Sequence, residues 1–506
     1  MPVERICWCA HAGLHNVGTE ENDMGIRLHF WGAAGTVTGS SHHIECAGQN
    51  LLLDCGLFQG RRLEAANLNS HLAFTPEQLA AGELNAVVIS HAHIDHTGVL
   101  PLLTKQGYSG PIYATPPTID LCVPMLKDSA FIQESDAEFM SKRRSKRHSI
   151  GVDPGPEPVA PLYSQEDAAQ VIHQMRPVEL HKAQLLAGST SDAGFSVTMS
   201  NAGHMLGSAC VLVDAVEKGK HTRLLFSGDV GRKNLPITRD PDAAPLADYL
   251  IMESTYGDRL HQPAGPIKQK LASIVKRVMA RGGHIIVPAF AVERTQQLVL
   301  LLHELIDAKE IPELPIFVDS PLATAVTEVF RKHTETWDEE PNAFTAKGET
   351  PFDWRRLRYT QTVQESKALN DLHVPYLVMS ASGMCEAGRI LHHLKNGIED
   401  SRNLILITGF QAENTLGRKL VERLPEVNIF GEPMRLRAEV DTIDSLSGHA
   451  DQQELLDWMA PATPGLKKVF LVHGEPTAQL ALKAKIEERY KLEVVIPKRG
   501  DRFEVS

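Results

Sequence analysis

The sequence predicts an α/β protein in which two architectures share one chain. The length of 506 residues allows about three domain-sized units, or two large ones. From 27 to 253, short apolar runs and turns are interleaved with helical patterns, which is typical of packed α/β layers. From 268 to 430, helices alternate regularly with short apolar strands. That alternation predicts βαβ units and a second domain with a mostly parallel sheet.

The elements of the first region follow from short β-rich runs and the turns between them. Gly48, Gln49 and Asn50 separate two apolar runs and predict a hairpin, and a second turn is expected at 218–220. The predicted strands are 43–46, 51–53, 86–90, 195–200, 209–215, 223–226 and 249–252. The predicted helices are 99–104, 117–127 and 165–174. Residues 141–162 run from basic to Pro/Gly-rich and predict a surface excursion.

The elements of the second region are bounded by glycines and by polar residues. Gly282 and Gly283 end its first helix. The predicted helices are 269–280, 293–305, 322–332, 388–394 and 413–424, and the strands are 284–287, 316–318, 376–379 and 404–408. Strands 438–443, 468–472 and 493–496 and helices 452–459 and 478–490 return to the style of the first region.

Composition excludes several classes of protein. The formal net charge is −12, so bulk positive charge does not coat nucleic acid, although a local basic groove stays compatible. The seven cysteines are scattered and odd in number, which argues against a disulfide framework. No apolar run approaches the roughly 18 residues of a membrane span, and the start lacks the apolar stretch of a signal peptide. We expect a cytoplasmic protein without a membrane partner.

Two polar segments carry open alternatives. Residues 1–23 show no periodicity, and we expect a poorly ordered extension before a first strand near Met24. Metal binding there is the alternative; its ligands would be Cys7, Cys9, His11 and His15. The basic run 142–148 suits either a nucleic-acid backbone or a solvated helix end.

A dense group of potential metal ligands follows the apolar strand 86–90. His91 and His93 alternate, so they point to the same side of the strand, while Asp95 and His96 continue into the turn and can face a second ion. Imidazole with carboxylate suits Zn²⁺, with Mn²⁺ or Fe as competitors. A solvated polar loop is the alternative, but four ligands within six residues favour a metal site.

The same arrangement of one His or Asp just past a strand recurs along the chain. His204, Asp229, His473 and Asp54 each follow a predicted strand, in most cases beside glycine. Such positions gather at one edge of a sheet, where an open catalytic metal site is built. For Asp54, a simple turn residue is the alternative.

This ligand pattern resembles that of the metallo-β-lactamase superfamily in its dinuclear, HxHxDH form. The resemblance implies a four-layer αβ/βα fold, with two sheets face to face and helices outside. It also implies two Zn²⁺ ions per chain, with Mn²⁺ as a substitute, and a hydroxide between them. One zinc would take His91, His93 and His204, the other Asp95, His96 and His473, while Asp229 bridges both and Asp54 orients ligands from behind.

Further motifs resemble the β-CASP branch of that superfamily. Glu253, His449 and His473 match its motifs A, B and C, and a histidine at motif C is associated with RNA-processing members. The resemblance implies a metallo-β-lactamase domain over 24–254, an inserted β-CASP domain on a mostly parallel sheet over 255–440, and a C-terminal part of the first domain over 441–506, its RNA-specificity segment. Asp95, His449 and Glu253 are the catalytic candidates. We expect His449 to act as general acid or phosphate clamp, with Glu253 holding it and Ser447 touching the phosphate.

The predicted strand ends of the insert carry candidate RNA contacts. Open α/β sheets bind ligands at the carboxyl ends of their strands, and helix starts attract phosphate. The candidates are Ser320, Ser382, Gly383 and Arg294, each with a turn or cap role as the alternative.

The resemblance therefore implies a zinc-dependent ribonuclease that hydrolyses phosphodiester bonds of single-stranded RNA in RNA processing or decay. The sequence is similar to the short bacterial and archaeal enzymes related to the core of the pre-mRNA 3′-end cleavage nuclease. The alternatives are a DNA nuclease of the same branch, a thioesterase- or lactonase-type metallo-hydrolase, and a non-catalytic RNA-binding scaffold. Endonucleolytic or 5′-exonucleolytic action stays open, as does the choice between a monomer and a homodimer.

Overall fold

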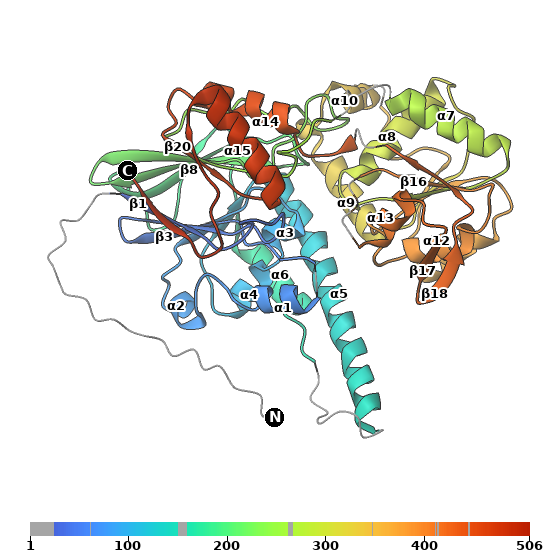
Figure 1. The fold of residues 1–506 in the computed structure, drawn as a ribbon, viewed down its shortest axis with the longest axis horizontal. Helices are drawn as coiled ribbons and strands as arrows, with labels where there is room; N and C mark the ends of the chain where they lie inside the picture. The colour runs from blue at the N-terminus through green and yellow to red at the C-terminus, as the bar shows by residue number, and fades with distance from the viewer. Residues whose placement is uncertain are drawn as a thin grey trace.

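The computed structural model describes residues 25–60, 62–149, 159–261, 267–346, 348–409, 411, 414–443 and 446–506. The predictions for residues 1–23, including metal binding by Cys7, Cys9, His11 and His15, lie outside the described residues. Figure 1 shows two lobes side by side, one built on two facing sheets and the other on a single sheet.

The larger lobe contains two seven-stranded sheets. The first has the order β22-β1-β2-β3-β4-β5-β6, with β1 (Ile26–Phe30), β2 (His42–Cys46), β3 (Gln49–Leu53), β4 (Ala86–Val88), β5 (Ile112–Ala114), β6 (Met175–Pro177) and β22 (Arg502–Val505). The second has the order β21-β20-β11-β10-β9-β8-β7, with β7 (Ala183–Leu185), β8 (Ala193–Asn201), β9 (Ala209–Glu217), β10 (Lys220–Phe226), β11 (Tyr249–Met252), β20 (Lys468–Leu471) and β21 (Glu493–Val495).

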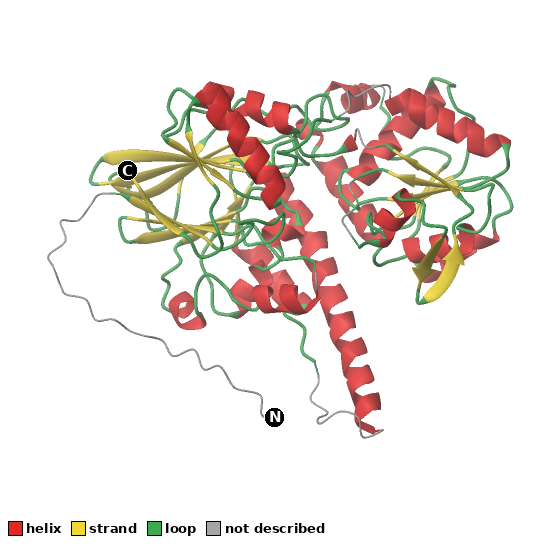
Figure 2. Ribbon diagram, in the orientation of Figure 1, coloured by secondary structure: helices red, strands yellow, loops and turns green. Residues whose placement is uncertain are grey.

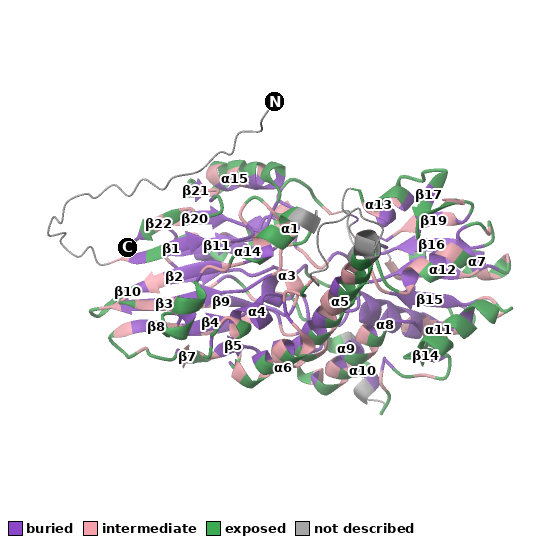
Figure 3. Cartoon of the chain, turned by 90° about the horizontal axis from the view of Figure 1, so that it is seen from below, coloured by how far each residue is buried: buried purple, intermediate pink, exposed green. Residues whose placement is uncertain are grey.

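Apolar side chains from both sheets fill the space between them. Alternation along β1 sends Ile26, Leu28 and Phe30 inward, where they share one core with Phe226 and Phe470 of the second sheet. Burying each such side chain contributes roughly 1.5–3 kcal/mol. In Figure 3 the strands at the centre of the lobe are largely buried, and the outer helices and loops carry many of the exposed residues.

Helices cover the outer faces of both sheets (Figure 2). On the first sheet they are α1 (Arg62–Asn69), α2 (Pro76–Ala80), α3 (Ile94–Thr97), α4 (Leu100–Lys105), α5 (Pro116–Ser149) and α6 (Gln165–Gln174). On the second sheet α14 (Gln452–Met459) and α15 (Pro476–Tyr490) share a separate core with its strands. This arrangement confirms the predicted four-layer αβ/βα fold.

The smaller lobe is built on a six-stranded, all-parallel sheet with the order β14-β13-β15-β12-β16-β19. Its strands are β12 (Ile285–Pro288), β13 (Ile316–Val318), β14 (Leu357–Tyr359), β15 (Leu377–Ser380), β16 (Leu404–Ile407) and β19 (Glu439–Thr442), and β17 (Glu426–Ile429) and β18 (Glu432–Arg435) form a hairpin. Its helices are α7 (Ile267–Ala280), α8 (Arg294–Asp307), α9 (Pro321–Lys332), α10 (Glu339–Ala346), α11 (Val363–Ala368), α12 (Ile390–Gly397) and α13 (Leu416–Val421). The predicted mostly parallel sheet is thus confirmed.

The structure corrects one predicted feature of the chain and defines a second more closely. The strand predicted at 438–443 does not return to the first lobe, because β19 pairs in parallel with β16 in the six-stranded sheet, so a boundary after 440 falls inside β19. The basic run 142–148 lies in α5, which continues as far as 149, so this part of the predicted surface excursion is helical. Figure 1 shows the second half of α5 extending away from both lobes. Within the described ranges, no helix combines the length and apolarity needed to cross a bilayer.

Hydrogen bonds and ion pairs join the two lobes. Asp120 on α5 lies 2.6 Å from the Lys332 ammonium and 2.5 Å from His333, at the end of α9. The backbone N–H of Asp338 donates to the carbonyl of Ile237 at 2.7 Å. These contacts define the face of the smaller lobe, the inserted domain, that meets the larger lobe.

Candidate metal centre

All predicted metal ligands come together at one edge of the two facing sheets. They lie on short segments that follow strands, because the chain leaves each strand at this edge and turns back outside it. His91 and His93 follow β4, Asp95 and His96 lie on α3, His204 follows β8, Asp229 follows β10 and His473 follows β20.

The loops that carry His204 and Asp229 cross in direct contact. A Cβ at Gly231 would lie 1.9 Å from the carbonyl oxygen of Gly203, so only glycine fits there. This close approach holds the His204 and Asp229 side chains next to each other.

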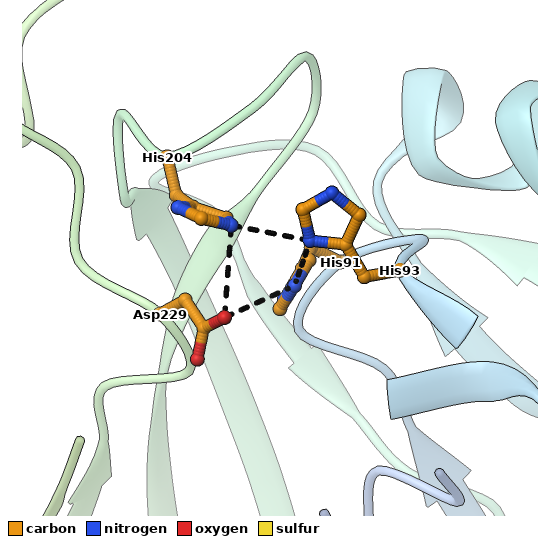
Figure 4. Close-up of side chains that lie close together, drawn as sticks. All are labelled: His91, His93, His204 and Asp229. Atoms are coloured by element: carbon orange, nitrogen blue, oxygen red, sulfur yellow. Dashed lines mark hydrogen bonds and ion pairs between the residues drawn. The ribbon is translucent and has the colours of Figure 1, made fainter. Parts of the chain in front are cut away.

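One half of the centre consists of His91, His93, His204 and Asp229 (Figure 4). His93 Nδ1 lies 3.1 Å from His91 Nε2 and 3.2 Å from His204 Nε2. Asp229 Oδ2 lies 3.5 Å from His91 Nε2 and 3.6 Å from His204 Nε2. The four donor atoms therefore converge on a single point.

The other half consists of Asp95, His96 and His473. His473 Nε2 lies 3.2 Å from His96 Nε2 and 3.5 Å from Asp95 Oδ2. Asp229 Oδ2 is 3.5 Å from His96 Nε2 as well, so this carboxylate lies between the two halves. The geometry brings all seven predicted ligands into one cluster.

Partners on the outer nitrogens orient the imidazoles. Asp54 is buried behind His96, with its Oδ2 2.6 Å from His96 Nδ1, and it also accepts hydrogen bonds from Ser40 and Ser90. The carbonyl of Gly448 lies 3.0 Å from His204 Nδ1. Each contact leaves the inner nitrogen free to face the centre, as in protein metal sites.

Burial keeps the histidines of the first half neutral. Desolvation lowers the pKa of His91 and His204 well below the usual range and that of His93 to about 4. Burial would raise the pKa of Asp229, but His473 and His96 of the other half outweigh that effect and hold the pKa well below its usual range. Neutral imidazoles around an ionised carboxylate are the donor set that a divalent cation requires.

The residues fit the metal ions that the ligand pattern implies. Buried Asp229 Oδ1 has no hydrogen-bond partner, which would be costly unless a cation binds it. Imidazole and carboxylate donors in this number suit Zn²⁺.

His449 lies beside the cluster with its Nδ1 facing a carboxylate. Nδ1 is 3.3 Å from Glu253 Oε2 and 3.8 Å from Asp229 Oδ2, and the ring packs on His204 with a centroid separation of 4.4 Å. Burial lowers the pKa of His449, but Glu253 and Asp229 outweigh that effect and raise it to about 9. Glu253 is itself held by the backbone N–H of Val230 at 2.6 Å.

The other predicted contacts lie near this pair or on the insert. Ser447 Oγ donates to the Tyr256 hydroxyl at 3.3 Å. Arg294 is buried, with its Nη1 bonded to Gln297 and its Nε without a partner. The Ser320 hydroxyl caps α9, and Ser382 Oγ accepts from the backbone N–H of Glu386. Gly383 is buried against the ring of Phe290. The RNA contacts predicted for these residues stay predictions.

Three residues that contact the predicted ligands or their loops were not predicted from the sequence. Ser90 Oγ lies 3.0 Å from His91 Nδ1, and Thr255 Oγ1 lies 3.1 Å from His473 Nδ1. Glu293, from the insert, accepts a hydrogen bond from the backbone N–H of Leu206 at 2.7 Å, two residues after His204. Their positions next to ligands or motif residues were the available signal, but hydroxyl and carboxyl side chains at turns are too common to single out.

Comparisons with known proteins agree with this geometry. Family models match the chain over three segments: the metallo-beta-lactamase superfamily at 34–120, the Beta-Casp domain at 295–420, and the Zn-dependent metallo-hydrolase RNA specificity domain at 433–497. Ribonuclease TTHA0252 of Thermus thermophilus is 36% identical over 90% of this chain and 95% of its own length. Transcription termination factor FttA of Methanosarcina mazei is 28% identical over 93% of this chain and 70% of its own length.

A solved structure has the same overall fold. The crystal structure of a protein of unknown function from Enterococcus faecalis covers 95% of this chain with a TM-score of 0.52 at 13% identity. Fold and ligand cluster together define a metallo-hydrolase of the metallo-β-lactamase class. The similarity to the Thermus ribonuclease over nearly both full lengths is more specific: the chain belongs to the β-CASP branch of that superfamily, and it is a hydrolytic nuclease.

Proposed function

We propose that this protein is a zinc-dependent ribonuclease that hydrolyses phosphodiester bonds of single-stranded RNA. The observation that carries the proposal is the His449–Glu253 pair beside the cluster of metal-binding side chains. A metal cluster alone suits many hydrolases. A carboxylate-held imidazole next to it adds the proton donor that a leaving alkoxide of a phosphodiester needs.

Two zinc ions would be held by the two halves of the cluster. His91, His93 and His204 would hold one, Asp95, His96 and His473 would hold the other, and Asp229 lies between the two halves. Bound zinc supplies Lewis acidity toward the phosphate and lowers the pKa of a water molecule that it binds toward neutrality. Mn²⁺ suits the same imidazole and carboxylate donors.

His449 would donate a proton from its Nε2 to the leaving oxygen. Its Nδ1 faces Glu253, so Nε2 is the ring nitrogen left for the substrate. Glu253 is fixed by Val230 and keeps the ring from rotating, which makes Glu253 a positioning residue. Ser447, two residues before His449, would bind a non-bridging oxygen of the phosphate.

RNA is favoured over DNA on three grounds. An RNA-specificity family model matches residues 433–497, a similar protein is named a ribonuclease, and histidine occupies the position of motif C. A strand reaching the metal centre passes the junction of the lobes, so we propose single-stranded rather than duplex RNA. Processing or decay of cellular RNA, in the cytoplasm, is the setting that this activity implies.

One comparison of substrates tests the proposal. Purified protein is incubated with labelled single-stranded RNA, single-stranded DNA and a chromogenic ester, each with and without EDTA, and its zinc content is measured. We expect cleavage of RNA alone, loss of cleavage in EDTA and two zinc ions per chain. Equal cleavage of DNA, turnover of the ester without RNA cleavage, or one zinc in active protein would overturn it.

A further inference from the structure

Phe290 presents an exposed aromatic ring at the carboxyl edge of the insert's sheet. It follows β12 and is 41% exposed, whereas Pro288 and Ala289 before it and Ala291 after it are buried. Among the described residues of the insert, the only other exposed phenylalanine is Phe430, in the hairpin turn between β17 and β18.

Glycines at the ends of the two neighbouring strands pack against this ring. Gly383 follows β15 and Gly409 follows β16, the two strands that flank β12. A Cβ on Gly383 would lie 2.7, 2.8 and 3.0 Å from Cδ2, Cε2 and Cγ of Phe290. Three nearly equal distances place Gly383 over the face of the ring rather than beyond its edge. The exposed area of Phe290 therefore belongs to the opposite face and rim.

The edge that carries Phe290 faces the metal centre. All six strands of this sheet are parallel, so their carboxyl ends share one edge. From that edge β19 leads through the next residues to His449, and the segment after β12 reaches Glu293, whose carboxyl group bonds Leu206 beside His204. Phe290 is separated from Glu293 by two residues, so the two Cα atoms lie at most about 11 Å apart.

We propose that the open face of Phe290 stacks on a nucleobase of the RNA strand near the cleavage site. This inference rests on the proposed ribonuclease function. Stacking on an aromatic ring tolerates every base, because each base has a π-face, and it holds a single strand without reading its sequence. Because Gly383 packs against one face of the Phe290 ring, we expect the ring to be positioned before RNA binds, so that little side-chain entropy is lost on binding.

The test compares two exposed phenylalanines of the same lobe. Phe290→Ala and the control Phe430→Ala are made in a His449→Ala background that does not cleave, and binding of labelled single-stranded RNA is measured by fluorescence anisotropy. Each variant is also measured with RNAs that carry one abasic nucleotide at successive positions. Gly383→Ala, whose added Cβ displaces the ring, and Phe290→Trp, which restores an aromatic face, complete the set.

Phe290→Ala should weaken binding by about tenfold and Phe430→Ala should leave it unchanged. One abasic position should weaken binding by the background protein by about the same factor and have no further effect in Phe290→Ala. Gly383→Ala should behave like Phe290→Ala, and Phe290→Trp should bind like the background protein.

Two results would overturn the stacking proposal. One is equal binding by the Phe290→Ala and Phe430→Ala variants. The other is weaker binding by Phe290→Ala with every abasic position keeping its effect, since the ring then only supports its loop. Absence of RNA cleavage by the wild-type protein is a separate result that overturns the proposed function, and the stacking proposal with it.

Discussion

At the scale of single residues, the metal centre is organised by contacts on the sides of the ligands that face away from it. Asp54 and Gly448 each contact the outer nitrogen of a ring that we propose as a ligand, and burial keeps the rings of the first half neutral. Binding affinity therefore depends on residues that would never touch the metal. The proposed proton donor, His449, is organised in the same way, because Glu253 faces its outer nitrogen.

His449→Ala should keep both zinc ions and lose most of the turnover. The ring is not needed as a ligand, and removal of a general acid typically lowers kcat by 10²–10⁴-fold. Elemental analysis and single-turnover RNA cleavage check both statements, with the exposed His221→Ala as the control. Loss of zinc from His449→Ala would show that His449 is a ligand instead.

Asp54→Ala should weaken zinc binding while leaving the ligands in place. Mutation of a residue that hydrogen-bonds the outer nitrogen of a metal-binding histidine typically lowers metal affinity 10- to 100-fold. Competition against a chromogenic chelator measures that affinity, and Asp192→Ala, at an exposed turn, is the control. An unchanged affinity would mean that Asp54 only shapes the turn after β3.

At the scale of elements, helix α8 of the insert begins against the loop of the other lobe that carries His204. Glu293 precedes α8 with a φ of 64°, a conformation that favours glycine, and it accepts the backbone N–H of Leu206. Gln297, one turn later, donates to the carbonyl of Pro236 at 3.4 Å. The start of one helix thus ties the insert to the loop that carries His204.

Glu293→Gln should stabilise the protein at high pH. Burial raises the pKa of Glu293 from 4.5 to about 8, so between these values the folded state keeps a proton that the unfolded chain releases. Wild-type stability therefore falls as pH rises from about 4.5 to 8. Glutamine cannot ionise and still accepts from Leu206, so its advantage should grow to the order of 4–5 kcal/mol at pH 8, since the shift from 4.5 to about 8 is about 3.5 pKa units and one unit is worth about 1.4 kcal/mol.

Urea unfolding of wild type and Glu293→Gln at pH 5 and pH 8 checks this prediction, with exposed Glu310→Gln as the control. A stability difference that is equal at both pH values would contradict it, because an effect independent of pH reports packing rather than ionisation.

Most elements could be predicted from the sequence because their apolar patterns are local. Helix Gln165–Gln174, with Ser164 as its cap, and strands Ile316–Val318 and Tyr249–Met252 have the predicted bounds. β22 was not predicted, because only its pairing with β1, nearly the whole chain away, makes it a strand. β19 was assigned to the wrong lobe for the same reason, since pairing with β16 decides its sheet.

The candidate site was more predictable than the contacts that support it. His91, His93, Asp95 and His96 are adjacent in the sequence, and their spacing indicates metal before any fold is known. Contacts such as Glu293 with Leu206 depend on how two lobes meet, and no local pattern records that. The ligand roles themselves stay predictions until a metal is measured.

At the scale of the whole molecule, the metal centre lies where the insert leaves the first lobe and returns to it. Glu253 directly follows β11, before the insert, and His449 follows β19, the insert's last strand. Glu253 and His449, the pair that we propose for catalysis, thus belong to the two connections between the lobes. RNA held between the lobes would meet both connections at the scissile phosphate.

RNA with a single 2′-deoxy residue at the cleavage site should still be cut there, leaving 5′-phosphate and 3′-hydroxyl ends. The proposed chemistry uses water activated at the metal centre and not the 2′-hydroxyl as nucleophile. Mass spectrometry of the products distinguishes these ends from a 2′,3′-cyclic phosphate. Blocked cleavage of the 2′-deoxy substrate, with a cyclic end from unmodified RNA, would exclude the mechanism.

The position of the insert also determines when the centre is completed during translation. β20, β21 and β22, which complete both sheets of the larger lobe, come after the insert, and so does His473. When the other six proposed ligands have been synthesised, the nascent chain still lacks His473 and β20, the strand that pairs with β11. A ribosome can therefore translate most of this protein before any of it is able to cut the messenger RNA that encodes it.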